Sequence, residues 1–224
     1  MSDLTLVIGN KNYSSWSMRA WLALKRTGAD FTEIQILLDQ PDTLENILIY
    51  SPTGKLPVLH HGKTVIWDSL AICEYAAETF PDAGLWPRSK EARARARAVC
   101  AEMHSGFEAL RTHMHMNVRD SFPGKGTGEG VAGDIRRIIE IWETCRANFG
   151  DGGAFLFGEF SIADAMFAPV VSRFITYGVD ISSTARDYMN AVWGTPEVQA
   201  WVAGALNEPF TILKYHPAPD TGIR

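Results

Sequence analysis

The sequence predicts an α+β protein in which a small domain of strands and helices precedes an all-helical domain. Up to about residue 80, short apolar runs typical of strands alternate with segments of helical periodicity, whereas every periodic segment beyond residue 90 is helical. The stretch between them is rich in Pro and Gly, as linkers are. We therefore expect domains at residues 1–81 and 90–224, joined by a linker at 82–89.

The first three elements are expected to be a strand, a helix and a strand. Leu4–Ile8 is a short apolar run, and from Trp16 apolar residues recur at helical spacings until Gly28. Residues 31–38 then alternate in the manner of a strand. A connection of this kind predicts a parallel, right-handed βαβ unit.

The next three elements are expected to be a hairpin and a helix. After an irregular stretch with a short helix around residues 44–50, two strands at 58–60 and 64–67 flank the turn His61-Gly-Lys63. A helix at residues 69–80 follows. The resulting βαβ-ββα order resembles the thioredoxin fold.

The second domain is expected to contain only helices. Ser161 with Asp164 three residues later is typical of a capping box, which predicts that a helix begins there. Pro196 suits the first turn of the last helix, and we expect the Pro-containing tail at 208–224 to pack loosely. The other helices are expected at about residues 91–116, 135–145, 184–193 and 195–206.

The composition argues against several classes of function. The chain has 224 residues, of which 46% are hydrophobic and 21% charged, as in ordinary globular proteins. Its net charge is −5 and its basic residues are dispersed, so we expect no nucleic-acid partner. There is no apolar run of the ~20 residues that a membrane-spanning helix needs, and no signal-like N-terminus. We expect a cytoplasmic protein.

The cysteines and histidines predict no metal site. Cys73, Cys100 and Cys145 lie far apart in apolar helical patterns and form no CxxC or metal spacing, so we interpret them as buried, reduced thiols. His113 and His115 are two residues apart, which places them on different sides of a helix.

The segment Ser51-Pro-Thr-Gly-Lys-Leu-Pro-Val-Leu59 is the first candidate for a binding site. Pro57 precedes an apolar run and cannot donate to a strand ladder. If the Leu56–Pro57 bond is cis, the N–H and C=O of Leu56 face outward and can bind an extended ligand backbone. The alternative is that Pro57 merely begins an edge strand.

Asp68 and Ser69 are the second candidate, at the entry to a helix. An acidic cap and a hydroxyl at a helix N-terminus can bind a ligand that carries both an amine and a carboxylate. The alternative is that these residues only cap the helix.

Together these segments resemble the glutathione-site signature of cytosolic glutathione transferases, which pairs the strand entry at 51–59 with the helix entry Asp68-Ser-Leu-Ala-Ile72. The resemblance implies a homodimer that uses glutathione as co-substrate and no metal. It implies that Lys55 meets the glycyl carboxylate, that the Leu56 backbone, held by Pro57, pairs with the cysteinyl unit, and that Asp68 and Ser69 hold the γ-glutamyl group.

Glutathione chemistry needs a thiolate, because the thiol is a poor nucleophile. A free thiol has a pKa near ~8.5, and lowering it by about two units takes roughly 2.7 kcal/mol. A hydroxyl donor and the positive end of a helix supply such stabilisation. Ser14 and Ser15 stand just before the first helix, where at least one is expected to serve as its N-cap.

The segment Ser14-Ser-Trp-Ser-Met-Arg19 resembles the S-S-C-x-x-R motif of the zeta class, which implies Ser14 as the catalytic serine. It departs from that motif at Trp16, where the class has cysteine. Tyr13 is the competing hydroxyl donor.

By the same resemblance, the second substrate lies between this loop and the long helix. Arg111 there favours an anionic acceptor, although a surface or dimer ion pair is the alternative. The residues expected in this pocket are Tyr13, Trp16, His104, Phe107 and Arg111.

These expectations describe a detoxifying glutathione transferase that attacks an electrophile with a serine-stabilised thiolate. The first alternative is a glutathione-dependent isomerase of the maleylacetoacetate type. The second is a non-catalytic glutathione-binding or interaction module of the same fold.

Overall fold

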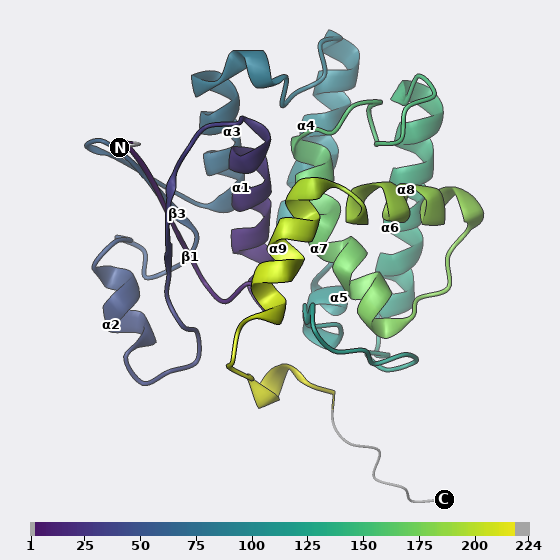
Figure 1. Cartoon of the computed structure of the whole chain (residues 1–224). Helices are drawn as coiled ribbons and strands as arrows, with labels where there is room; N and C mark the ends of the chain where they lie inside the picture. The colour runs from purple at the N-terminus through teal and green to yellow at the C-terminus, as the bar shows by residue number, and fades with distance from the viewer. Residues whose placement is uncertain (1–2, 218–224) are drawn as a thin grey trace, which may run out of the picture.

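The computed structural model describes residues 3–217 and places a four-stranded mixed sheet in the N-terminal part of the chain (Figure 1). The strands are β1 (Leu4–Ile8), β2 (Thr32–Gln35), β3 (Val58–His61) and β4 (Thr64–Trp67). Their order in the sheet is β2-β1-β3-β4, so β1 and β3 are central. β1 pairs parallel with β2 and antiparallel with β3, and β3 pairs antiparallel with β4.

Three helices complete this part: α1 (Ser15–Arg26), α2 (Thr43–Leu48) and α3 (Ser69–Thr79). α1 connects the two parallel strands and α3 follows the hairpin, so the predicted thioredoxin-like βαβ-ββα fold is confirmed. β2 is shorter than the predicted strand at 31–38. β1 ends at Ile8, which pairs with Gln35, so the residues that follow have no partner strand.

The rest of the chain is helical, as predicted, and lies to the right of the sheet in Figure 1. A short turn, η1 (Pro81–Ala83), follows α3 and leads into the second part. Its elements are α4 (Lys90–Ser105), α5 (Glu108–His113), α6 (Val131–Phe149), α7 (Ile162–Tyr177), α8 (Ser183–Trp193), α9 (Pro196–Leu206) and the turn η2 (Leu213–Tyr215).

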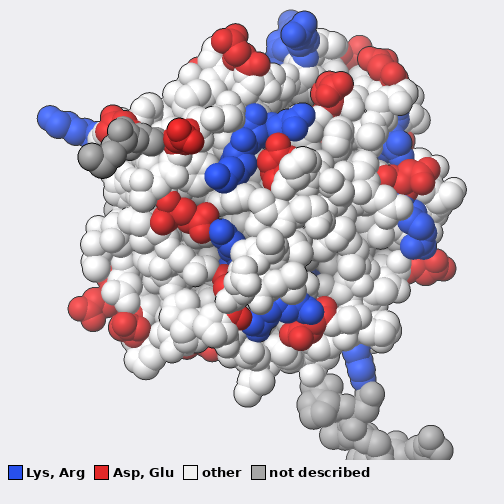
Figure 2. Space-filling model, in the orientation of Figure 1, with Lys and Arg blue, Asp and Glu red and all other residues white. Residues whose placement is uncertain are grey.

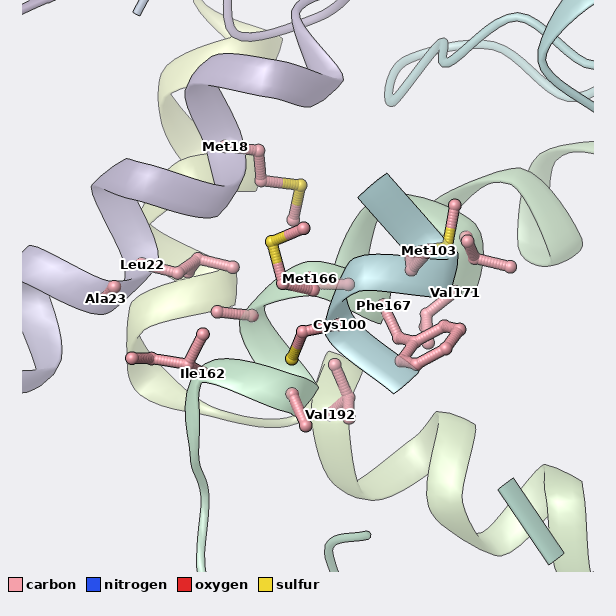
Figure 3. Close-up of a cluster of buried hydrophobic side chains, with 14 of the residues drawn as sticks. Met18, Leu22, Ala23, Cys100, Met103, Ile162, Met166, Phe167, Val171 and Val192 are labelled. Atoms are coloured by element: carbon pink, nitrogen blue, oxygen red, sulfur yellow. The ribbon is translucent and has the colours of Figure 1, made fainter. Parts of the chain in front are cut away.

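A shared hydrophobic core joins the two parts. Met18 and Leu22 of α1 face Met166 of α7, and Cys100 and Met103 of α4 complete the cluster (Figure 3). All five side chains are almost fully buried. Close packing of this kind gives the N-terminus of α1 a fixed position relative to α4 and α7.

The predicted single helix at residues 91–116 is interrupted, and this prediction is wrong. α4 ends before Gly106, and Phe107 takes a left-handed conformation with φ of 60° before α5 begins. The guanidinium of Arg111 donates to the carbonyls of Met103, His104 and Gly106, the last at 2.6 Å. It thereby satisfies the carbonyl groups that a helix leaves unpaired at its C-terminus.

The tail also differs from its expected loose packing. The Glu208 side chain is buried, and its carboxylate accepts the backbone N–H groups of Lys11 and Asn12 at 2.5 and 3.1 Å. Residues 208–216, here named the C-terminal strap, thus pack against the loop before α1. The expectation for residues 218–224 lies outside the described part of the chain.

The surface shown in Figure 2 intersperses acidic and basic side chains, in keeping with the dispersed charge of the sequence. Within residues 3–217, no helix is both long and apolar enough to cross a membrane. The same residues contain no group of three or more His, Cys, Asp or Glu side chains able to hold a metal ion.

Candidate functional site

A cavity of about 830 Å³ lies where the sequence analysis placed the first binding segment. The Leu56–Pro57 peptide bond is cis, as hypothesised. Among the described residues, neither the N–H nor the C=O of Leu56 makes a backbone hydrogen bond. The cavity is lined by Ser14, Trp16, Leu38, Ile47, Thr53, Gly54, Lys55, Leu56, Pro57, Trp67, Asp68, Ser69 and His104.

Asp68 and Ser69 bound this cavity at the start of α3. Asp68 is the N-cap, and its Oδ1 accepts the N–H groups of Leu70 and Ala71 at 2.8 and 3.2 Å. Its Oδ2 lies 3.1 Å from Nε2 of His104, and 43% of the side chain remains exposed. The Ser69 hydroxyl is buried and has no hydrogen-bond partner among residues 3–217. Asp68 therefore caps the helix and still presents a carboxylate to the cavity.

Ser14 also lines this cavity and stands at the N-terminus of α1. Its hydroxyl accepts the N–H of Ser17 at 3.3 Å and donates to Oγ of Ser17 at 2.7 Å. Oγ of Ser17 in turn accepts the N–H of Gly9 at 3.1 Å, which ties this pair to the end of β1. Ser14 is thus the N-cap that the sequence predicted for one of the two serines.

A second cavity of about 290 Å³ adjoins the first and shares Ser14, Trp16 and Leu38 with it. Its remaining wall comes from the loop before α1, from α1 itself, from the helical part and from the strap. The lining consists of Tyr13, Ser14, Ser15, Trp16, Leu38, Arg111, His115, Met116, Arg173 and Tyr215.

The hydroxyls of Ser15 and Tyr13 are engaged elsewhere. Oγ of Ser15 accepts from Nη2 of Arg173 at 3.4 Å. Oη of Tyr13 accepts the N–H of Ile212 at 3.0 Å, and this bond holds the strap. Of the three predicted hydroxyl donors, only Ser14 lines both cavities.

Trp16, which replaces the cysteine of the zeta-type motif, lies between two arginines. Cζ of Arg19 is 4.4 Å and Cζ of Arg111 is 4.9 Å from its ring centroid, within the range of cation–π interactions. The His104 ring meets it edge-on at 5.2 Å. The indole therefore separates the two cavities and is held by cations.

The arginines create a positive potential at the N-terminus of α1. Burial, together with repulsion from Arg111, lowers the pKa of Arg19 to about 9 and that of Arg173 to about 10. Both values leave the guanidinium groups charged at neutral pH. The partial positive charge of the helix terminus adds to this field, so an anion is favoured beside Ser14.

Phe107 is the predicted pocket residue that lines neither cavity. The break after α4 turns its ring into the core, where 7% of the residue is exposed. His104 and Arg111 line different cavities for the same reason, because they no longer share one helical face.

Several lining residues were missed by sequence reasoning. Arg173 had a usable signal, since it is a charged residue within the apolar run of α7 and such residues are seldom buried without a role. Ser17 supports Ser14 and was overlooked inside the motif that contains it. The missed residues of the two walls are Leu38, Ile47, Thr53, Gly54, Trp67, His115, Met116, Arg173 and Tyr215.

The described cysteines are unsuited to nucleophilic chemistry. All three are free and buried, as predicted. Burial raises the pKa of Cys73 to about 12 and that of Cys145 to about 11, and it raises the pKa of Cys100 as well. A thiol of this kind is almost wholly protonated at neutral pH.

Two family models match the chain. One, described as "Glutathione S-transferase, N-terminal domain", matches residues 13–79, and the other, "Glutathione S-transferase, C-terminal domain", matches residues 125–204. The chain belongs to the glutathione S-transferase family. The predicted family and its enzyme class, glutathione transferase, are confirmed, and both predicted binding segments fall within the first match.

Relatives of two kinds are similar over most of the chain. A protein from Caenorhabditis elegans named "Probable maleylacetoacetate isomerase" is 36% identical over 217 residues, which are 93% of this chain and 92% of that protein. "Glutathione S-transferase 1" from Dianthus caryophyllus is 28% identical over 171 residues, 75% and 76% of the two chains.

The solved structure of a glutathione transferase homolog from Burkholderia GL BGR1, with bound glutathione, shares the fold with a TM-score of 0.70. It is 26% identical and covers 90% of this chain and 97% of that one.

Proposed function

We propose that the protein binds glutathione in the larger cavity and stabilises its thiolate with the Ser14 hydroxyl for attack on an electrophile in the smaller one. The position of Ser14 carries this proposal, because it is where the two cavities meet at the N-terminus of α1. A sulfur atom there reaches both a ligand held by the first cavity and an acceptor in the second.

The polar groups of the larger cavity match those of glutathione. The free N–H and C=O of Leu56 suit the cysteinyl backbone, and Lys55 suits the glycyl carboxylate. The half-exposed Asp68 carboxylate suits the γ-glutamyl amine, while the unpartnered Ser69 hydroxyl suits the adjacent carboxylate. Each group has the charge or the hydrogen-bonding role that its partner requires.

The Ser14–Ser17 pair supplies a donor to the sulfur through a reversal of one hydrogen bond. In the free protein Ser14 donates to Ser17. Because both groups are hydroxyls, Ser17 is able to donate to Ser14 instead, which frees the Ser14 hydrogen for the thiolate. When Ser17 donates to Ser14 and Ser14 donates to the thiolate, the two hydrogen bonds polarise each other. This strengthens the hydrogen bond to the sulfur.

An isomerase of the maleylacetoacetate type is the second candidate function. Arg111 and Arg173 line the smaller cavity and favour an anionic acceptor, and the relative from Caenorhabditis elegans carries that enzyme's name. Arg111 also caps α4, so a structural role competes with acceptor binding. Against this candidate, Trp16 stands where the motif of the isomerase class has cysteine.

Retention on immobilised glutathione and assays with two acceptors distinguish the transferase, the isomerase and the non-catalytic module. We expect the protein to be retained, and to conjugate a chlorinated nitroaromatic compound to glutathione. Turnover of maleylacetoacetate without conjugation would favour the isomerase. Failure of retention would favour the non-catalytic module.

Replacing Asp68 by Asn is expected to weaken glutathione binding about tenfold, because the amine loses a partly exposed ionic partner. The Asn oxygen still accepts the α3 N–H groups, so folding is preserved. We expect the turnover number at saturating glutathione to change less than threefold. Calorimetry and steady-state kinetics measure the two effects.

Asp42→Asn makes the same chemical change at the N-terminus of α2 and serves as the control. A larger effect of Asp68→Asn on turnover than on binding would contradict the assigned role.

We further propose a cytoplasmic homodimer with a detoxifying role, as is typical of this family. Analytical ultracentrifugation of the purified protein tests the oligomeric state.

A further inference from the structure

The C-terminal strap, residues 208–216, closes one side of the smaller cavity. Tyr215, near its end, lines this cavity together with Ser14 and Trp16. Its ring centroid lies 4.9 Å from that of His115 and 5.6 Å from that of Tyr13. The ring is therefore packed between two other lining residues, one from the loop before α1 and one from the segment after α5.

The strap is held by several anchors up to Ile212. Both carboxylate oxygens of Glu208 accept backbone N–H groups of the loop before α1, and Nε2 of Gln35 donates to the same carboxylate at 2.5 Å. The guanidinium of Arg119 donates to the carbonyl of Phe210 at 2.8 Å and to Oγ1 of Thr211 at 3.1 Å. Ile212 is itself buried. These contacts fix the position of the strap where it reaches the cavity.

Beyond Ile212 a single turn, η2, presents Tyr215 to the cavity. The N–H of Tyr215 donates to the carbonyl of Ile212 at 3.0 Å, which closes the turn. Lys214 forms an ion pair with Asp39, the residue next to Leu38 of the cavity wall. Leu213 points away from the cavity, and 77% of it is exposed. One side of this turn thus belongs to the cavity and the other to solvent.

We propose that Tyr215 is a specificity-determining residue, whose ring packs against the group attached to the sulfur and sets the size of acceptor that the enzyme takes. This inference rests on the proposed function. A thioether formed beside Ser14 projects its substituent into the smaller cavity, because Ser14 lines both cavities. An aromatic substituent there meets the Tyr215 ring.

The test compares binding of glutathione with that of S-benzylglutathione by calorimetry. We expect Tyr215→Ala to weaken S-benzylglutathione about three- to tenfold, the usual worth of one aromatic contact, and to change glutathione binding less than twofold. Tyr215→Phe keeps the ring and is expected to retain the wild-type ratio. Leu213→Ala lies on the solvent side of the same turn and is the matched control.

Three outcomes would overturn this inference. A ratio of the two affinities in Tyr215→Ala within twofold of wild type would show that the ring does not contact the substituent. An equal loss for both ligands would assign the ring to the fold instead. If wild-type protein bound no glutathione, the proposed function would be wrong, and the role of Tyr215 with it.

Discussion

Replacing Ser14 by Ala is expected to lower kcat/KM for glutathione conjugation about 25-fold near pH 7. Without the hydroxyl donor, the pKa of the bound thiol returns from about 6.5 toward the free value of about 8.5, and the thiolate fraction at pH 7 falls from about three quarters to about 3%. Loss of one donor to a developing or resident anion has effects of this size or larger in other enzymes. The arginines and the helix terminus remain, so activity is expected to fall without being abolished.

The dependence of kcat/KM on pH is the decisive measurement. In Ser14→Ala the profile is expected to move to higher pH by about two units, and the lost activity to return in alkaline buffer. Ser17→Ala is expected to produce a smaller shift in the same direction, because Ser17 supports the Ser14 hydroxyl. Ser15→Ala is expected to leave the profile in place, since Ser15 does not line the larger cavity.

Ser14 also caps α1, so its removal is expected to cost about 1 kcal/mol of stability. Ser89→Ala, which removes the N-cap of α4, reproduces that cost at a place remote from both cavities and controls for it. A pH profile that moved in Ser15→Ala and not in Ser14→Ala would reverse the assignment of the two serines.

The larger cavity, where we propose that glutathione binds, was predictable from the sequence because its polar groups lie in three short segments. The residues from Lys55 to Pro57 form one strand entry, Asp68 and Ser69 form one helix entry, and Ser14 begins another helix. The geometry within each segment is local, so a sequence motif encodes most of it. The fold places the three segments around one cavity, as the βαβ-ββα order requires.

The smaller cavity, the proposed acceptor site, was not predictable in the same way, because its wall comes from segments far apart in the chain. Arg173 reaches it from α7, and Tyr215 reaches it from the strap. No local sequence pattern indicates which cavity either side chain lines. The expected placement of Phe107 assumed a continuous helix. Helical periodicity continues through Gly106, but a tertiary contact, the Arg111 guanidinium on the carbonyls of α4, stabilises a break there.

The largest expected effect on stability comes from Asp164, the capping-box residue of α7. Its Oδ2 accepts the N–H and the hydroxyl of Ser161 at 2.8 and 3.0 Å, and its Oδ1 accepts the N–H of Leu156 at 3.1 Å. Asp164→Ala leaves these buried donors unpaired at the start of a helix in which almost every residue is buried. We expect the free energy of unfolding to fall by about 3 kcal/mol, measured by urea denaturation.

Ser182→Ala removes an ordinary N-cap from α8 and is expected to cost only about 1 kcal/mol. Equal losses in these two variants would show that Asp164 acts as a helix cap and nothing more.

The pH dependence of this stability distinguishes a buried carboxylate from a neutral cap. Burial raises the pKa of Asp164 from 3.8 to about 6, although the hydrogen bonds from Ser161 and Leu156 oppose the rise. Because the folded state holds this proton more tightly than the unfolded chain, the part of the stability that is linked to protonation of Asp164 is greatest below about pH 4 and is lost as the pH rises through about 6. The Asp164→Asn variant has no titratable group at this position and therefore serves as the reference.

The stability of the wild type relative to Asp164→Asn is therefore expected to decrease by about 2–3 kcal/mol between about pH 4 and about pH 7. Urea denaturation of both proteins across this range measures the difference, in which the titration of all other groups cancels. A difference that stays constant with pH would mean that Asp164 titrates alike in the folded and unfolded chains. The start of α7 would then be stabilised by hydrogen bonding alone, without an ionisation that burial opposes.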